Sequence, residues 1–151
     1  MMILNNHALL LKNGFRKTIL LLLFFGCSSL LADIAVVVHP QSAVSTITQR
    51  EAIDVFLGKT RELRDGTRLI PLDQRAGGQV RNEFYRRAAN KSASQLKAYW
   101  SRQVFTGQGE PPMSMRDDEE IKLLISQNPN MIGYIDAEKV DASVRTVLLI
   151  R

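Results

Sequence analysis

The residues best suited to do chemistry lie in one short segment near the middle of the chain. Residues 71–84, with the sequence PLDQRAGGQVRNEF, have the pattern of a strand end, a loop with one arginine and two glycines, and a helix start. That order aims unpaired backbone N–H groups and the positive end of a helix at one point. The chemistry it favours is noncovalent binding of a phosphate, a sulfate or a carboxylate.

The candidate ligand-binding residues belong to this loop and to the first turn of the helix. They are Arg75, Ala76, Gly77, Gly78, Gln79 and Arg81. Arginine can hold an oxyanion through two parallel hydrogen bonds, and glycine allows either close approach to a ligand or a positive φ in a tight turn. Two alternatives remain open: Arg75 could be a surface residue bonded to Asp73 or to loop carbonyls, and Arg81 could lie on a solvated helix face.

Other residue types give little support for catalysis or metal binding. His39 is the one histidine after residue 32, and its place before a proline favours a structural role. The acidic run 117–120 suits the start of a helix, because consecutive helix positions point in different directions and cannot share a metal. The serines have no evident base, and the glycine loop lacks the Gly-Lys-Ser/Thr ending of a P-loop. We expect no enzyme activity, no catalytic residue, no metal and no cofactor.

The N-terminus has the composition of an export signal. Basic residues precede an apolar run over residues 19–25, and small residues follow it. The run is shorter than the roughly 20 residues of a membrane span. We expect residues 1–32 to be a signal peptide cleaved after Ala32, and residues 33–151 to form a single domain in the periplasm. Lipoprotein processing at Cys27 is the alternative, because it follows a glycine as at a lipoprotein junction.

Setting this segment aside changes the meaning of the charge. The whole chain has 20 basic and 15 acidic residues, a net charge of +5, and the only charges in residues 1–32 are Lys12, Arg16 and Lys17. The remainder has 17 basic and 15 acidic residues, a net charge of +2. It has no basic stripe interleaved with aromatics, so we expect no nucleic-acid partner. Its sequence has no cysteine, so it must fold by hydrophobic burial without disulfides.

The elements that would position the loop alternate between strand and helix. Apolar, β-branched runs predict strands over residues 34–38, 68–72, 131–135 and 144–150. Capping residues and apolar periodicity predict four helices: one between Thr48 and Gly58, one over 79–89, one capped by Ser92 that ends at Phe105, and one that opens at 117–120 and closes before Pro129.

This alternation predicts the fold class and the core. We expect an α/β fold, namely a three-layer α/β/α single domain with a mainly parallel or mixed sheet. The third helix should be one of the largest contributors to the core, through Leu96, Tyr99, Trp100 and Phe105.

Three stretches resemble the phosphate-type periplasmic substrate-binding proteins of ABC transporters, and they follow one another along the chain in the same order as in that family. Residues 53–59 (IDVFLGK) resemble a helix end of that family, and residues 130–135 (NMIGYI) resemble its strand near the return to the hinge. Residues 75–78 fall between them, where the family has an arginine followed by a Gly-Ser-Gly-Thr phosphate loop. The resemblance covers most of residues 34–150 and implies the fold of one lobe of a type II periplasmic binding protein.

The resemblance also implies a function and partners. The chain would be an exported substrate-binding component of an ABC transporter that binds phosphate or a similar small oxyanion, through Arg75, Gly77, Gly78 and the amides leading into Gln79 and Val80. The hydroxyls of the family loop are missing, and the length suits one lobe of two. A homodimer or another partner could close the site. The alternative function is an envelope interaction module that keeps the fold without a ligand and docks on a transporter permease or a sensor protein.

Overall fold

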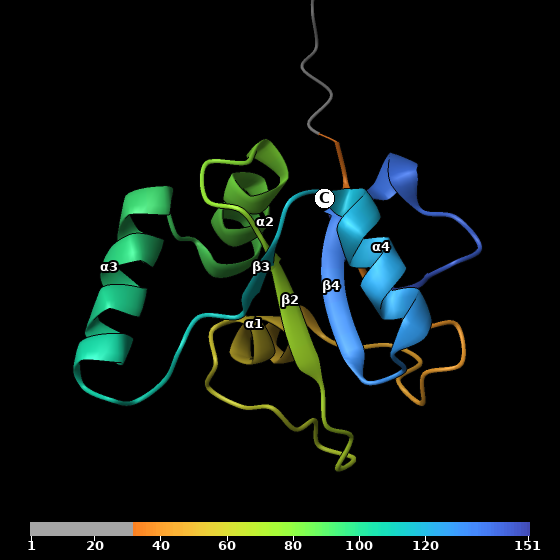
Figure 1. Cartoon of the computed structure of the whole chain (residues 1–151), viewed down its shortest axis with the longest axis horizontal. Coiled ribbons are helices and arrows are strands. Elements are labelled where there is room, and N and C mark those ends of the chain that lie inside the picture. Colours follow the sequence, from red (N-terminus) through yellow and green to blue (C-terminus); the bar gives the residue numbers. More distant parts are fainter. Residues whose placement is uncertain (1–31) are drawn as a thin grey trace, which may run out of the picture.

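The computed structural model describes residues 32–151, in which a five-stranded mixed sheet has helices on both faces (Figure 1). The strands are β1 (Ile34–Val38), β2 (Ile70–Gln74), β3 (Met113–Met115), β4 (Met131–Asp136) and β5 (Arg145–Ile150). Their order across the sheet is β3-β2-β4-β1-β5. β2 is parallel to both of its neighbours, and β1 is antiparallel to both of its own. The predicted mixed α/β sheet is confirmed.

Local hydrogen bonds define the ends of the helices α1 (Gln49–Phe56), α2 (Gln79–Ala89), α3 (Ala93–Phe105) and α4 (Asp118–Gln127). Thr48 and Ser92 each form a capping box, at the starts of α1 and α3, as predicted. Asp117 caps α4, and Asn90 ends α2 in the left-handed conformation. A short 3₁₀ helix, η1 (Ala137–Lys139), follows β4.

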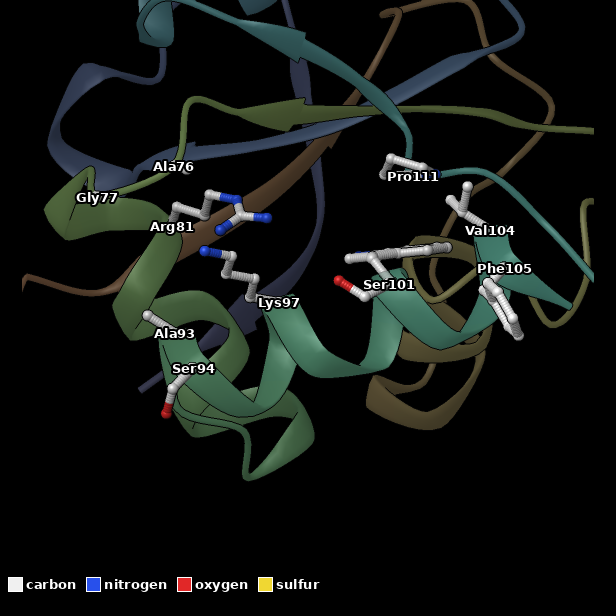
Figure 2. A pocket seen from close by; sticks show the side chains of 11 residues that line it. Ala76, Gly77, Arg81, Ala93, Ser94, Lys97, Ser101, Val104, Phe105 and Pro111 are labelled. Carbon is white, nitrogen blue, oxygen red and sulfur yellow. The ribbon is translucent and has the colours of Figure 1, made fainter.

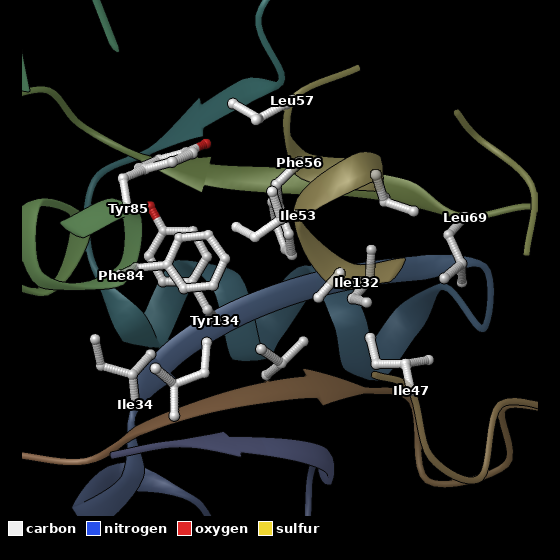
Figure 3. Close-up of a cluster of buried hydrophobic side chains, with 14 of the residues drawn as sticks. Ile34, Ile47, Ile53, Phe56, Leu57, Leu69, Phe84, Tyr85, Ile132 and Tyr134 are labelled. Carbon is white, nitrogen blue, oxygen red and sulfur yellow. The ribbon is translucent and has the colours of Figure 1, made fainter. Parts of the chain in front are cut away.

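The core lies on both faces of the sheet, which makes three layers. On the face of α1 and α2, the rings of Phe84 and Tyr134 stack with centroids 3.9 Å apart, and Phe56 meets Phe84 edge-on (Figure 3). On the other face, Ile121 and Ile125 of α4 pack against the sheet. All five residues of β1 are buried, and they alternate between the two clusters. This explains the continuous apolar run of β1.

Two sequence-based expectations need correction, and one strand was not predicted. Phe105 is 91% exposed rather than part of the core, because five residues turn a helix by about 140° away from Trp100. The second strand is shifted from 68–72 to β2, since Arg68 pairs instead with Glu62 in an isolated bridge. The three-residue β3 was not expected; it is too short to show an alternating pattern.

The predicted signal peptide and its lipoprotein alternative at Cys27 lie outside the described residues, apart from Ala32. Within residues 32–151, every helix falls short of the length and apolar character that a membrane crossing requires.

Candidate functional site

The carboxyl end of β2 delivers the chain into the predicted anion loop. Arg75 follows the strand, its side chain is exposed, and its backbone N–H donates to the carbonyl of Met115 in β3, at 2.9 Å. Gly77 has φ +85°, a conformation that L-residues rarely adopt. Of the two roles considered for this glycine, close approach to a ligand or a tight turn, the positive φ favours the turn. A Cβ atom at Gly78 would lie 3.3 Å from the carbonyl oxygen of Arg75, so this position is sterically tight.

Helix α2 begins without a side-chain cap. Its N-cap is Gly78, which has no side chain to accept from the first turn, whereas side-chain oxygens cap α1, α3 and α4. The backbone N–H groups of Gln79, Val80 and Arg81 make no hydrogen bond to another described residue. Because the helix dipole adds to these free donors, the start of α2 has the properties of an anion site.

Arg81 is fixed beside this helix start by a buried carboxylate. Its Nε donates to Oδ2 of Asp73 at 3.0 Å, and its side chain is only 12% exposed. The guanidinium carbon also lies 5.2 Å from the centre of the Tyr85 ring. The solvated position considered for Arg81 is therefore wrong. Arg75 is a surface residue, as its alternative stated, but the partner of Asp73 is Arg81 rather than Arg75. Within residues 32–151, Nε is the atom of Arg81 that donates, which leaves both Nη groups for a ligand.

Asp73 is held by a network that the sequence did not reveal. Tyr134 donates its hydroxyl to Oδ1, and Tyr85 donates its hydroxyl to Oδ2 at 3.2 Å. The backbone N–H of Gln74 also donates to Oδ1. Burial, and then the negative charge of Asp73, raise the pKa of both tyrosines well above its usual value, so the phenols remain protonated donors. Because the carboxyl group of Asp73 is held by three other donors, it gives Arg81 a fixed position.

A groove with a volume of about 820 Å³ runs along α3 to the start of α2 (Figure 2). Three of the six candidate residues line it, namely Ala76, Gly77 and Arg81. Arg75, Gly78 and Gln79 lie outside its lining.

Lys97 is a groove residue that sequence reasoning missed. The charged ends of Lys97 and Arg81 point toward the same part of the groove, while Val104 and Phe105 lie at its other end (Figure 2). Lys97 is exposed and has no ion-pair partner among the described residues. Helical spacing from Lys97 to Ser101 and Val104 was the available signal that these side chains share one face of α3.

The acidic run and His39 have structural contacts. Asp118 is buried, accepts from Gln74 and pairs with Lys139 at 2.9 Å, in addition to the capping by Asp117. The hydrogen bond to Asp118, and then the negative charge of Asp118, raise the pKa of Lys139. The Nδ1 atom of His39 accepts from the backbone N–H of Gln41. Within residues 32–151, no cluster of three or more histidine, cysteine, aspartate or glutamate side chains could hold a metal ion.

Comparison with known proteins finds similarity in structure. No protein-family model matches the chain, and no curated sequence matches it. A phosphate ABC transporter substrate-binding protein from Clostridium perfringens, solved with bound phosphate, has a TM-score of 0.60 at 23% identity, over 78% of this chain and 45% of that one. An ABC-type phosphate transport receptor from Vibrio cholerae has a TM-score of 0.60 at 17% identity, over 78% of this chain and 46% of that one.

A third similar structure is PstS from Borrelia burgdorferi, with a TM-score of 0.50 at 13% identity, over 69% of this chain and 41% of that one. At these identities the likeness establishes the fold, and it confirms the predicted architecture of one lobe of a periplasmic binding protein. The chain spans less than half the length of each of the three structures.

Proposed function

We propose that this protein binds phosphate or a similar small oxyanion noncovalently at the start of α2. The observation that carries the proposal is the uncapped first turn of α2 next to Arg81. Asp73 holds the guanidinium of Arg81 through Nε, and neither Nη group bonds to another residue of the range 32–151. Free amides supply hydrogen bonds and a partial positive charge. A guanidinium supplies charge-assisted bonds, which are about twice as strong as neutral ones.

The surrounding residues would complete this site. Lys97 adds a second positive charge from α3, and the exposed Arg75 adds another from the loop. Because the groove is open to water, the charges act in a high dielectric, and we expect a dissociation constant on the order of millimolar rather than nanomolar. Binding would involve no chemical turnover.

The biological setting follows from the same proposal. The two similar proteins named for phosphate transport favour a role as the exported binding component of an ABC transporter, with a permease or an envelope sensor as protein partner. Residues 1–32 would be the signal peptide, and residues 33–151 would form the domain in the periplasm, either soluble or anchored through Cys27. A second copy of the chain could close over the ligand.

A second candidate function is docking on another envelope protein without a ligand. The observation that favours it is the apolar end of the groove, where Val104 and Phe105 are exposed. Exposed apolar side chains that gather in a groove mark contact surfaces more often than scattered ones do.

Thermal unfolding with added phosphate tests the proposal. At 10 mM phosphate and a dissociation constant of about 1 mM, binding adds about 1.4 kcal/mol to the native state. For a domain of this size, this should raise the melting temperature by about 5 °C. Sodium chloride at equal ionic strength is the reference, because screening alone also changes stability.

Three charge-removing variants locate the site. Arg75→Ala and Lys97→Ala should each weaken the phosphate-dependent rise, while leaving the protein folded, because both side chains are exposed. Arg102→Ala is the matched control: it removes an exposed positive charge from α3 outside the groove lining, and it should leave the rise unchanged. If phosphate, sulfate and small carboxylates at millimolar concentration all leave the melting temperature unchanged, the proposed function is wrong.

A further inference from the structure

We infer that the groove along α3 binds an organic phosphate, with the phosphate group at Arg81 and Lys97 and an apolar ester group over the far end. This inference rests on the proposed function, because the same start of α2 receives the anion. It goes beyond that function by naming the ligand class as phosphomonoesters with an apolar or aromatic group.

The size of the groove is the first argument. Its volume of about 820 Å³ lies in the range of about 300–1,000 Å³ that holds small organic molecules. An inorganic oxyanion at the α2 start would occupy the cationic end and leave the rest of the groove to water. A ligand with a second chemical group would use both ends.

The distribution of charge along the groove is the second argument. The charged ends of Arg81 and Lys97 point toward one end of the groove, and Val104 and Phe105 lie at the other (Figure 2). Trp100 also lines the groove and lies between Lys97 and Val104 in the sequence of α3. Val104 is 55% exposed, and Phe105 is 91% exposed. An ester group over these two side chains would remove apolar surface from water on both partners, which is favourable. Cations at one end and apolar residues at the other complement a ligand with an anionic head and an apolar body.

The wall of the groove also has a hydrogen-bond donor without an acceptor. Trp100 is only 7% exposed, and its indole Nε1 is buried with no partner among residues 32–151. Buried N–H groups are nearly always paired, so an unpaired one indicates that an acceptor is missing. Because Nε1 has less than 1 Å² of accessible surface, an oxygen of a phosphomonoester would reach it only after the indole shifts toward the groove.

Isothermal titration calorimetry with three ligands of similar charge tests the inference. Phenyl phosphate has the apolar group, glycerol 3-phosphate has a polar ester group of similar size, and inorganic phosphate has none. We expect phenyl phosphate to bind the protein about 10-fold more tightly than either of the others, at constant pH and ionic strength.

Variants in the apolar end separate the ester group from the anion. The double variant Val104→Ser with Phe105→Ser should remove the 10-fold preference for phenyl phosphate and leave the affinity for inorganic phosphate unchanged, because both side chains are distant from Arg81. Both side chains are exposed, so the fold should be retained. Leu123→Ser is the matched control, since Leu123 is an exposed apolar residue of α4 outside the groove lining.

Each outcome distinguishes this inference from the proposed function. Equal affinity for phenyl phosphate and inorganic phosphate would overturn the inference and leave the proposed function standing. No binding of any of the three ligands would overturn both. A dimer in solution that the double serine variant dissociates would show that a second copy covers the apolar end, and would also overturn the inference.

Discussion

Replacing Asp73 by alanine is expected to lower the free energy of unfolding by about 3–5 kcal/mol, the usual cost of removing one partner from a buried ion pair. The substitution removes the acceptor of Arg81 and of the hydroxyls of Tyr85 and Tyr134 at once. The guanidinium of Arg81 is mostly buried and would lose its counter-charge. Urea unfolding followed by circular dichroism measures the change.

A second variant of Asp73 and a control variant show how much of this cost comes from the lost negative charge. Asp73→Asn keeps the shape and one acceptor, so it should cost less than Asp73→Ala. Arg75→Ala is the control from the loop that follows β2; its exposed side chain makes no hydrogen bond or ion pair to the described residues, so the cost should stay below about 0.5 kcal/mol. A cost below about 1 kcal/mol for Asp73→Ala would contradict a network in which Asp73 holds Arg81, Tyr85 and Tyr134.

Replacing Gly133 by alanine is expected to destabilise the protein by about 1–3 kcal/mol or more, the usual cost of overpacking a core. A Cβ atom there would lie 2.6 Å from Cγ2 of Ile121 and 3.1 Å from Cδ1 of Ile125, both in α4. The absent side chain thus allows α4 to approach β4. Thermal unfolding measures the loss, and 1 kcal/mol corresponds to about 4 °C for a domain of this size.

A double-mutant cycle tests the stated cause. Ile121→Ala removes the atom that the new Cβ would meet, so Gly133→Ala should cost less in that background than in the native one. Gly109→Ala is the matched control, because no atom lies within 4 Å of a Cβ atom there and its φ is not positive. Equal costs for Gly133→Ala in both backgrounds would show that Ile121 is not the obstacle.

The positions of the helices could be predicted because local bonds determine their ends. The capping boxes of Thr48 and Ser92 join residues three positions apart, so the sequence shows both partners together. Asn90 acts in the same way through its own left-handed conformation. The buried strand β1 was evident from its apolar run, because both of its faces are covered.

The position of Arg81 could not be predicted, because the partners of Asp73 lie 8, 12 and 61 residues away. Only the packing of α2 and β4 against β2 brings them together. The structure explains the motif at residues 130–135: the absence of a side chain at Gly133 lets α4 pack closely against β4, and the hydroxyl of Tyr134 donates to Asp73. Its resemblance to a binding-protein family therefore reflects the fold.

The groove was missed because it requires the placement of α3. The expected core role of Phe105 assumed that every large apolar residue of the helix faces inward, but Leu96 and Trp100 define the buried face. Lys97 gave no signal on its own, since a lysine on a helix is usually a solvated residue. The sequence does not show that α3 lies beside the start of α2, because contacts between separate segments of the chain determine that position.

The most direct test of the oxyanion site is a phosphate titration followed by amide ¹H–¹⁵N NMR spectra of the protein. Binding at the start of α2 predicts saturable shifts at the N–H groups of Gln79, Val80 and Arg81, with smaller changes at Lys97. Sodium chloride at the same ionic strength should leave these resonances in place. Phosphate-dependent shifts confined to other parts of residues 32–151, or no saturable shift up to about 20 times the expected millimolar dissociation constant, would contradict the account.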